Sequence, residues 1–352
     1  MKILILLRDL SLNGITTYNR ILSRALTDQG HEVYVWPSDA TMSSRKAFKL
    51  PLLHPWMAAL VRHRLQDVRP DLVLVHHYTQ ARLAHRLQAT AGIPWVAVMH
   101  NAHSPRRMAQ WARLYGNAAG VVTMCETLRA QYTALVERTE MPAGRAPPPV
   151  LLSRLPIDAP PARTHRPGAP LRLAYCSRLS AQKGPRCEAW LRAIATLPER
   201  AECKVLVIGA GSYLERLRRI AAQLGLQAEF SGQLADPGSR LDEVDVITGA
   251  GYALMEGLVR GCSGLALGFS GCFGAIGEHN LEPAFGVNFG DQSVQPNATD
   301  VASIACELRL AIDALQGAGP GRVRERCIEH FRPAPIVGEL VDFLRQVAPG
   351  AR

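Results

Sequence analysis

Residues 245–264 read DVITGAGYALMEGLVRGCSG, an order of apolar strand, glycine turn and helix. Glycine lets the backbone come close to a ligand, and the first turn of a helix offers unpaired N–H groups and the positive end of the helix dipole. We therefore expect a diphosphate at the turn Gly249-Ala250-Gly251, with Glu256 accepting hydrogen bonds from an attached ribose. A plain structural turn with a surface glutamate would have the same pattern. The candidate binding residues of this stretch are Gly249, Gly251, Tyr252, Ala253, Leu254 and Glu256.

The same alternation of strand and helix runs along the whole chain and predicts an α/β protein with two Rossmann-like, doubly wound domains. Such domains bind ligands at the carboxyl ends of their strands, so two of them are expected to face a central cleft. Ten short apolar segments are expected to be buried parallel strands: Ile3–Leu7, Val33–Trp36, Leu72–His76, Trp95–Met99, Val121–Met124, Leu171–Cys176, Cys203–Ile208, Ala228–Ser231, Asp245–Thr248 and Gly264–Gly268.

Proline marks the boundary between the two domains. Nine of the 24 prolines lie between Pro142 and Pro170, where neither a helix nor a central strand can continue. We expect a first domain over residues 1–150, a linker over 151–170 and a second domain over 171–332. A last helix over 333–352 is expected to pack back on the first domain.

Composition narrows the class of protein. The sequence has no uninterrupted apolar run of about 18 residues, and MKILILLRD at the start is expected to form a first strand rather than a signal peptide. The eight cysteines are scattered without a CxxC pair, which favours reduced thiols over a zinc ribbon or a disulfide framework. These features predict a cytoplasmic protein that does not span a membrane.

Charge is distributed unevenly along the chain. Residues 1–150 hold 18 Lys and Arg against 9 Asp and Glu, whereas the remainder holds 22 against 21. The excess of the net charge of +10 therefore lies in the first domain, which favours an anionic partner there, such as a phosphorylated substrate, an acidic membrane face or nucleic acid. A solvated basic surface without any partner is the alternative.

Two further loops follow predicted strands. Arg178-Leu179-Ser180-Ala181-Gln182-Lys183 places two cations five residues apart, where they could hold both phosphates of a nucleoside diphosphate. The sequence KVLVIGAG, with Gly209, partly resembles a dinucleotide-binding fingerprint. Leu214 occupies the position of the third glycine and no acidic residue follows at the expected distance, so NAD is disfavoured. A glycine loop over Gly268–Gly274 is expected to line the same cleft.

The first domain contributes Gly14 and a group of histidines. Gly14 opens a helix after the first strand and could approach a phosphate. His76 and His77 end one strand and His100 follows another, without the spacing of an HxH or HExxH metal site. A hydrogen-bonding role toward a substrate is expected for His100, and a structural strand-end histidine is the alternative. We expect no bound metal and no cofactor.

In their order and spacing these motifs resemble the GT-B glycosyltransferases, in particular the retaining glycosyltransferase family 4. The segments that carry the resemblance are Asp71–His76, Gly92–His100, Arg178 with Lys183-Gly184, Val207–Gly211, Phe230–Gly232 and Glu256 before Gly261. The resemblance implies transfer of a hexose from a nucleoside-diphosphate sugar, such as a UDP- or GDP-sugar, with retention of the anomeric configuration and without a metal.

The resemblance also implies roles for single residues. Arg178 and Lys183 would neutralise the leaving diphosphate, Glu256 would bind the donor ribose, and His100 would lie beside the transferred sugar. Gly14 would approach a phosphate of the donor or the acceptor. The acceptor would be anionic or a glycan, for example a glycolipid or a cell-envelope polysaccharide precursor at the inner membrane face, and not nucleic acid.

The chain departs from the family at one position, because the family usually has a second glutamate eight residues before Glu256 and this chain has Thr248. A different donor sugar or looser sugar recognition would follow from that change. Three alternative functions stay open: a sugar-nucleotide-binding protein without catalysis, a non-hydrolysing sugar-nucleotide epimerase of the same architecture, and an NAD-dependent oxidoreductase.

Overall fold

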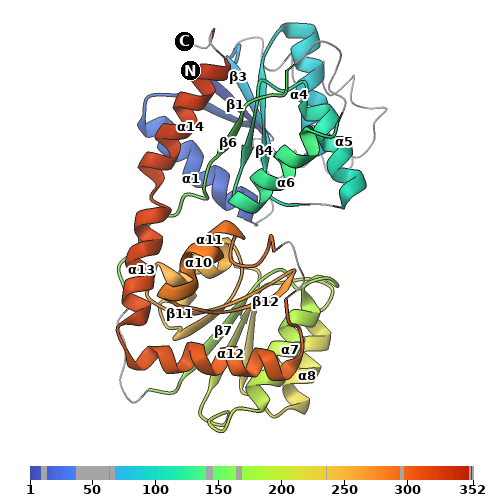
Figure 1. Cartoon of the computed structure of the whole chain (residues 1–352). Helices are drawn as coiled ribbons and strands as arrows, with labels where there is room; N and C mark the ends of the chain where they lie inside the picture. Colours follow the sequence, from blue (N-terminus) through green and yellow to red (C-terminus); the bar gives the residue numbers. More distant parts are fainter. Residues whose placement is uncertain are drawn as a thin grey trace. The chain divides into compact units, whose positions relative to one another are not determined.

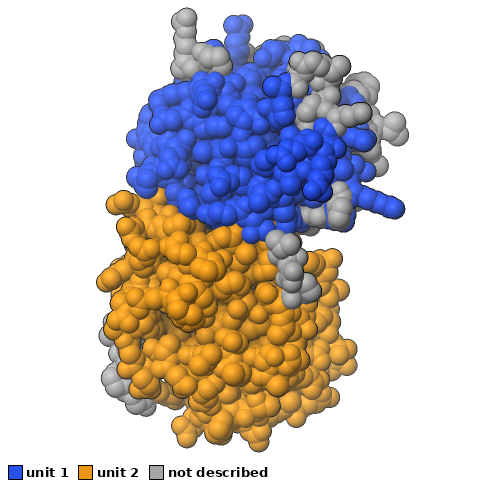
Figure 2. Space-filling view, viewed as in Figure 1, with its two compact units in different colours: residues 1–156, 333–352 blue, residues 157–332 orange. Residues whose placement is uncertain are grey.

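The computed structural model describes residues 1–8, 14–36, 63, 68–102, 104–139, 146–163, 169–234, 236–293, 297–348 and 350. They belong to two compact units, shown in different colours in Figure 2. Unit 1 comprises residues 1–156 and 333–352, and unit 2 comprises residues 157–332. Each unit is built around one six-stranded sheet, so the predicted class of two α/β domains is confirmed.

Unit 1 contains a parallel sheet with the strand order β2-β1-β3-β4-β5-β6. Its strands are β1 Lys2–Leu6, β2 Glu32–Trp36, β3 Leu72–Val75, β4 Trp95–Met99, β5 Gly120–Thr123 and β6 Val150–Leu152. The described helices are α1 Gly14–Asp28, α4 Tyr78–Ala91, α5 Pro105–Tyr115, α6 Glu126–Val136 and α14 Pro333–Val347. The last helix, α14, contacts α1 and belongs to this unit.

Burial explains why the strands of unit 1 are apolar runs. Every residue of β3, β4 and β5 is buried, because helices cover both faces of the sheet (Figure 1). Trp95 of β4 is fully buried and packs against the ring of Tyr115 at the end of α5. Parallel strands of this kind end at a common edge, where their loops can form a site.

Unit 2 has the strand order β12-β11-β10-β7-β8-β9. Its strands are β7 Arg172–Cys176, β8 Lys204–Ile208, β9 Ala228–Gly232, β10 Val246–Gly249, β11 Ser263–Gly268 and β12 Gly271–Ile276. Its α-helices are α7 Gly184–Ala195, α8 Leu214–Gln223, α9 Gly238–Leu241, α10 Tyr252–Leu258, α11 Leu281–Gly286, α12 Val301–Asp313 and α13 Gly319–His330, and two 3₁₀ turns cover Glu278–Asn280 and Ala314–Gln316. All pairs of neighbouring strands are parallel except β11 and β12.

The structure corrects two details of the predicted architecture. The segment Gly268–Gly274, expected to be a loop, is a tight hairpin, because residues from Gly271 onward pair with β11 as an antiparallel edge strand. Residues 150–152, which span the predicted boundary between the first domain and the linker, form β6 and extend the first sheet. Part of the predicted linker, residues 164–168, lies outside the described residues.

None of the described helices is both long and apolar enough to cross a membrane.

Candidate functional site

The loop between β7 and α7 holds the two predicted cations of unit 2. The Ser180 hydroxyl accepts a hydrogen bond from the backbone N–H of Lys183 at 3.3 Å, and the Ser180 carbonyl accepts one from the N–H of Gly184 at 2.7 Å. Arg178 is exposed, whereas Lys183 is half-buried and forms an ion pair with Asp291, with Nζ 3.1 Å from Oδ1 and 3.2 Å from Oδ2. The loop therefore presents one exposed guanidinium and one ammonium that already has a carboxylate partner.

The loop after β8 passes directly against the loop after β7. The N–H of Ser177 donates to the carbonyl of Ile208 at 3.1 Å, and the N–H of Leu179 donates to that of Ala210 at 3.0 Å. Gly209 has φ 146°, and a Cβ added there would lie 1.9 Å from the Ser177 carbonyl oxygen. The need for glycine at this predicted donor-binding position is therefore explained by backbone packing between the two loops.

The glycine turn after β10 has the order of strand, turn and helix that the sequence indicates. Gly251 precedes α10 with φ 56°, and a Cβ added to it would lie 3.3 Å from Nδ2 of Asn288. A Cβ on Gly249 would lie 2.9 Å from the carbonyl oxygen of Cys176, so the turn also lies against the end of β7. Because α10 has only seven residues, its dipole is small, and the close backbone approach is the stronger feature of the turn.

Glu256 occupies the second turn of α10 and is half-buried. Its backbone carbonyl accepts a hydrogen bond from the Arg260 guanidinium at 2.8 Å. Burial, with a smaller contribution from the negative charge of Glu256, raises the pKa of the Cys176 thiol to about 12. Tyr252 and Leu254 are buried and Ala253 is half-buried, so these three predicted residues offer mainly backbone atoms.

Thr248, at the position of the family's first glutamate, lies in β10 and is fully buried. Its hydroxyl oxygen has no hydrogen-bond partner among the described residues. The side chain is therefore closed off from solvent and does not replace a glutamate that would reach into a pocket.

The β11–β12 hairpin brings an exposed aromatic ring to the same edge of the sheet. Phe269 is 53% exposed, and its backbone N–H donates to Oδ1 of Asp291 at 3.0 Å. Asp291 was not predicted from the sequence. The sequence gives only a weak indication of it, namely an acidic residue that follows the turn-forming residues Asn288 and Gly290. Because β7, β10 and β11 are parallel, their carboxyl ends bring these residues together.

The carboxyl edge of the sheet in unit 1 holds a buried cluster of rings. His76 follows β3 and His100 follows β4, and Nδ1 of His76 lies 2.8 Å from Nε2 of His100 in a hydrogen bond. The Tyr18 ring of α1 packs edge-on against both imidazoles, with centroid distances of 5.7 and 5.2 Å. Gly14, the predicted phosphate contact, is exposed as the first residue of α1.

Burial keeps this cluster neutral. It lowers the pKa of His100 to about 3 and lowers the pKa of His76 well below its ordinary value. Nε2 of His76 and the Tyr18 hydroxyl are buried without a hydrogen-bond partner among the described residues. No group of three His, Cys, Asp or Glu side chains that could hold a metal ion occurs in the part of the chain that the structure describes.

Comparisons with known proteins agree with these motifs. Residues 12–141 match the sequence model of Glycosyltransferase Family 4. No curated protein matches the chain in a sequence search.

Solved structures match over nearly the whole chain. The Anabaena protein HepE, solved in complex with UDP-glucose, has a TM-score of 0.72 at 17% identity, over 98% of this chain and 100% of that one. Sucrose-phosphate synthase from Thermosynechococcus elongatus has a TM-score of 0.76 at 15% identity, over 99% and 100%. A glycosyltransferase from Rickettsia africae has a TM-score of 0.66 at 13% identity, over 98% of both chains.

At these identities the likeness shows the fold, which is the two-domain GT-B fold. The family match over residues 12–141 and this fold confirm the resemblance to GT-B glycosyltransferases that the motifs predict.

Proposed function

We propose that the protein transfers a hexose from a nucleoside-diphosphate sugar to an acceptor hydroxyl, with retention of configuration and without a metal ion. The observation that carries this proposal is the carboxyl edge of the sheet in unit 2. There the Arg178–Lys183 loop, the glycine turn before α10 and Glu256 meet at the ends of β7 and β10. HepE, which has this fold, was solved with UDP-glucose, which favours a UDP-sugar as the first donor to test.

The chemistry of the donor fits the residues present. The leaving group is a nucleoside diphosphate, whose developing negative charge is stabilised by cations and backbone N–H groups. Arg178 is exposed and offers a planar fork of N–H donors, and Lys183 offers a point charge. These two side chains would supply the positive charge that a divalent metal supplies in other transferases.

Transfer would proceed on one face of the sugar. The bond between the anomeric carbon and the phosphate oxygen breaks, the acceptor oxygen bonds to that carbon from the same side, and the acceptor proton passes to the leaving phosphate. His100 of unit 1, neutral because of its burial, would orient the sugar by a hydrogen bond. Gly14, at the exposed start of α1, would approach a phosphate.

We propose the class of acceptor from the excess of positive charge in the first domain. Residues 1–150 carry 18 Lys and Arg against 9 Asp and Glu, which fits an anionic glycolipid or a cell-envelope polysaccharide precursor. A protein that acts on such an acceptor would be cytoplasmic and would contact the inner membrane face peripherally.

One observation favours a second candidate, a sugar-nucleotide-binding protein without catalysis. Thr248 is fully buried, so the usual carboxylate contact to the donor sugar is missing. Release of nucleoside diphosphate from a sugar nucleotide, measured with and without acceptor extracts, separates the two candidates. Binding without release under both conditions would favour the non-catalytic protein.

A thermal-shift panel of sugar nucleotides identifies the donor, and calorimetry then tests the site. We expect Lys183→Ala and Glu256→Ala each to weaken binding of the matching nucleoside diphosphate by about tenfold or more, about 1.4 kcal/mol each. The matched control is Lys204→Ala, because Lys204 is an exposed lysine at the amino end of β8, at the opposite edge of the same sheet. Equal affinity in all three variants and the wild type would overturn the site.

A further inference from the structure

The ion pair between Lys183 and Asp291 joins two distant parts of unit 2. Both carboxylate oxygens lie within hydrogen-bond distance of the ammonium, at 3.1 and 3.2 Å, although the residues are 108 positions apart. Their side chains are only 21% and 16% exposed. Screening by solvent is therefore weaker than for a surface pair. The cation proposed to hold the donor diphosphate is already neutralised in the free protein.

The Asp291 carboxylate is held in place by the hairpin. Its Oδ1 accepts the backbone N–H of Phe269 at 3.0 Å. A Cβ added to Gly268 would lie 2.7 Å from that oxygen and 2.9 Å from Cβ of Ala250. The carboxylate therefore lies beside the turn after β10, which is where the diphosphate is proposed to bind.

The backbone that leads to Asp291 is in a costly conformation. Asn288, Phe289 and Gly290 have φ angles of 50°, 55° and 87°, so three consecutive residues are left-handed and two of them are not glycine. Such conformations persist only where the surrounding structure holds them. Here the N–H of Phe289 donates to the carbonyl of Ala284 at 2.7 Å, and the Phe289 side chain is fully buried. Packing thus fixes the position of Asp291.

We propose that Asp291 is a built-in counter-ion that competes with the donor diphosphate for Lys183. This proposal rests on the proposed function, because it takes the diphosphate site as given. To use Lys183, a diphosphate must draw the ammonium from the carboxylate or share it, and it must approach a fixed negative charge. Asp291 therefore lowers the affinity of the site for diphosphate and favours release of the nucleoside diphosphate product.

The test is Asp291→Asn, which removes the charge and keeps an oxygen that can accept the Phe269 N–H. Calorimetry with UDP, GDP and ADP compares this variant with the wild type, and the free nucleosides uridine, guanosine and adenosine serve as ligands without phosphate. We expect the nucleoside diphosphate that binds to bind about threefold to tenfold more tightly to Asp291→Asn. Affinity for the nucleoside should not change.

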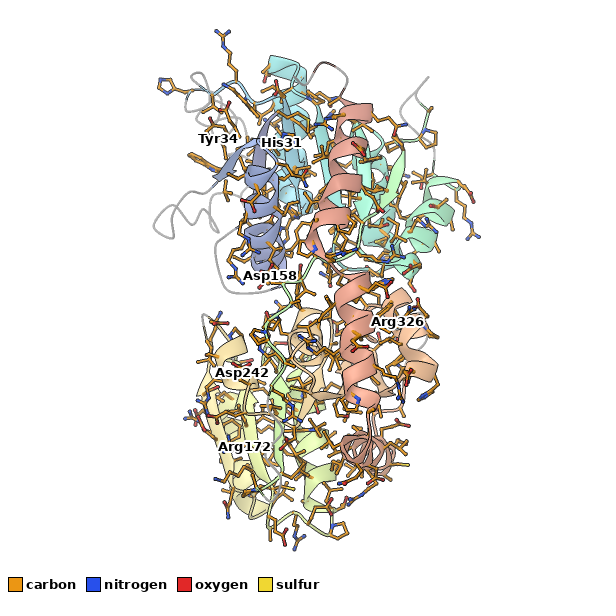
Figure 3. The ribbon with its side chains drawn as sticks, turned by 90° about the vertical axis from the view of Figure 1, so that its left-hand side faces the viewer. His31, Tyr34, Asp158, Arg172, Asp242 and Arg326 are labelled. Carbon is orange, nitrogen blue, oxygen red and sulfur yellow. The ribbon has the colours of Figure 1, made fainter. Side chains whose placement is uncertain are left out.

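Glu243→Gln is the matched control for a general loss of negative charge. Glu243 pairs with Arg172. Arg172, which is labelled in Figure 3, is the first residue of β7 and lies at the opposite end of that strand from the loop that holds Lys183. This control should bind as the wild type does. Asp291→Ser is the second variant if the asparagine variant melts early, and it should show the same direction of change.

The outcomes separate the two proposals. If Lys183→Ala weakens diphosphate binding but Asp291→Asn binds as the wild type or more weakly, the counter-ion role is wrong and the site stands. If none of the diphosphates binds the wild type or Asp291→Asn, both proposals are wrong. Tighter binding that also appears in Glu243→Gln would show a general charge effect and overturn the specific role of Asp291.

Discussion

The carboxyl edges of the two sheets are both formed mainly by parallel strands, but their side chains have opposite chemistry. In unit 2, glycine turns bring backbones together around a charged pair, Lys183 and Asp291. In unit 1, packed rings fill the corresponding edge, and His76 and His100 stay neutral because they are buried. The comparison teaches that a parallel sheet fixes where a site forms, and that the loops decide whether the site suits a charged or a neutral group.

The largest expected effect tests whether the carboxyl edge of the sheet in unit 2 requires glycine where its loops pack against each other. Gly209→Ala would place a Cβ 1.9 Å from the Ser177 carbonyl oxygen at a φ of 146°. We expect a loss of roughly 3 kcal/mol in the free energy of unfolding, from combined steric and backbone strain. Urea unfolding followed by tryptophan fluorescence measures the change.

Gly321→Ala is the matched control within unit 2. Gly321 lies in α13, and an added Cβ there meets nothing within 4 Å. That variant should be neutral or more stable than the wild type, since alanine favours helix. A similar small effect in both variants would mean that the loops after β7 and β8 move apart easily, and the contrast between the two edges would weaken.

The next effect concerns the neutral edge of unit 1 and appears on acidification. Below pH 6.5 the unfolded chain protonates its histidines, whereas the pKa of folded His100 is about 3 and that of folded His76 is well below its ordinary value. The folded state then binds fewer protons than the unfolded chain. The contribution of these two histidines to the free energy of unfolding is therefore fully present above pH 6.5 and is lost as the pH falls toward 3. The expected loss is about 1.4 kcal/mol per pH unit for each histidine.

The measurement is the free energy of unfolding between pH 6.5 and 5 for the wild type and His100→Asn. As the pH falls, the free energy of unfolding of the variant should decrease less steeply than that of the wild type, by about 1.4 kcal/mol per pH unit, which is the contribution of one histidine. His279→Gln is the control, because His279 is an exposed histidine of unit 2. Equal slopes for the wild type and His100→Asn would show that His100 is protonated in the folded protein and that the edge is not neutral.

Much of the fold could be predicted because buried parallel strands are apolar runs. All ten predicted strands are present, for example Trp95–Met99, which is β4. The two missed strands lack that signal: β6 has three residues after a run of prolines, and β12 reads GCFGAI at an antiparallel edge. Glycine weakens strand propensity, so pairing with β11 decides that strand rather than its own sequence.

The candidate site was predicted where its residues lie at or near the ends of strands. His100 follows β4, Lys183 lies in the loop after β7, and Gly249 is the last residue of β10. Asp291 could not be found in this way, because a left-handed backbone after α11 brings it to Lys183 across 108 positions. Side-chain partners that depend on such a turn leave no periodic pattern in the sequence.

The smallest expected effect concerns the Tyr18 hydroxyl in the ring cluster of unit 1. The Tyr18 hydroxyl is buried, burial raises the pKa of this phenol, and it has no hydrogen-bond partner among the described residues. Tyr18→Phe removes that unpaired polar atom and keeps the ring against both imidazoles, so we expect a gain of about 1 kcal/mol in the free energy of unfolding. The control is Tyr34→Phe, which removes a hydroxyl that donates to Glu32 at 2.8 Å on the surface and should cost a few tenths to about 1 kcal/mol. If Tyr18→Phe destabilises the protein instead, the hydroxyl is paired in solution, and the neutral edge is a connected polar network rather than a packed cluster of rings.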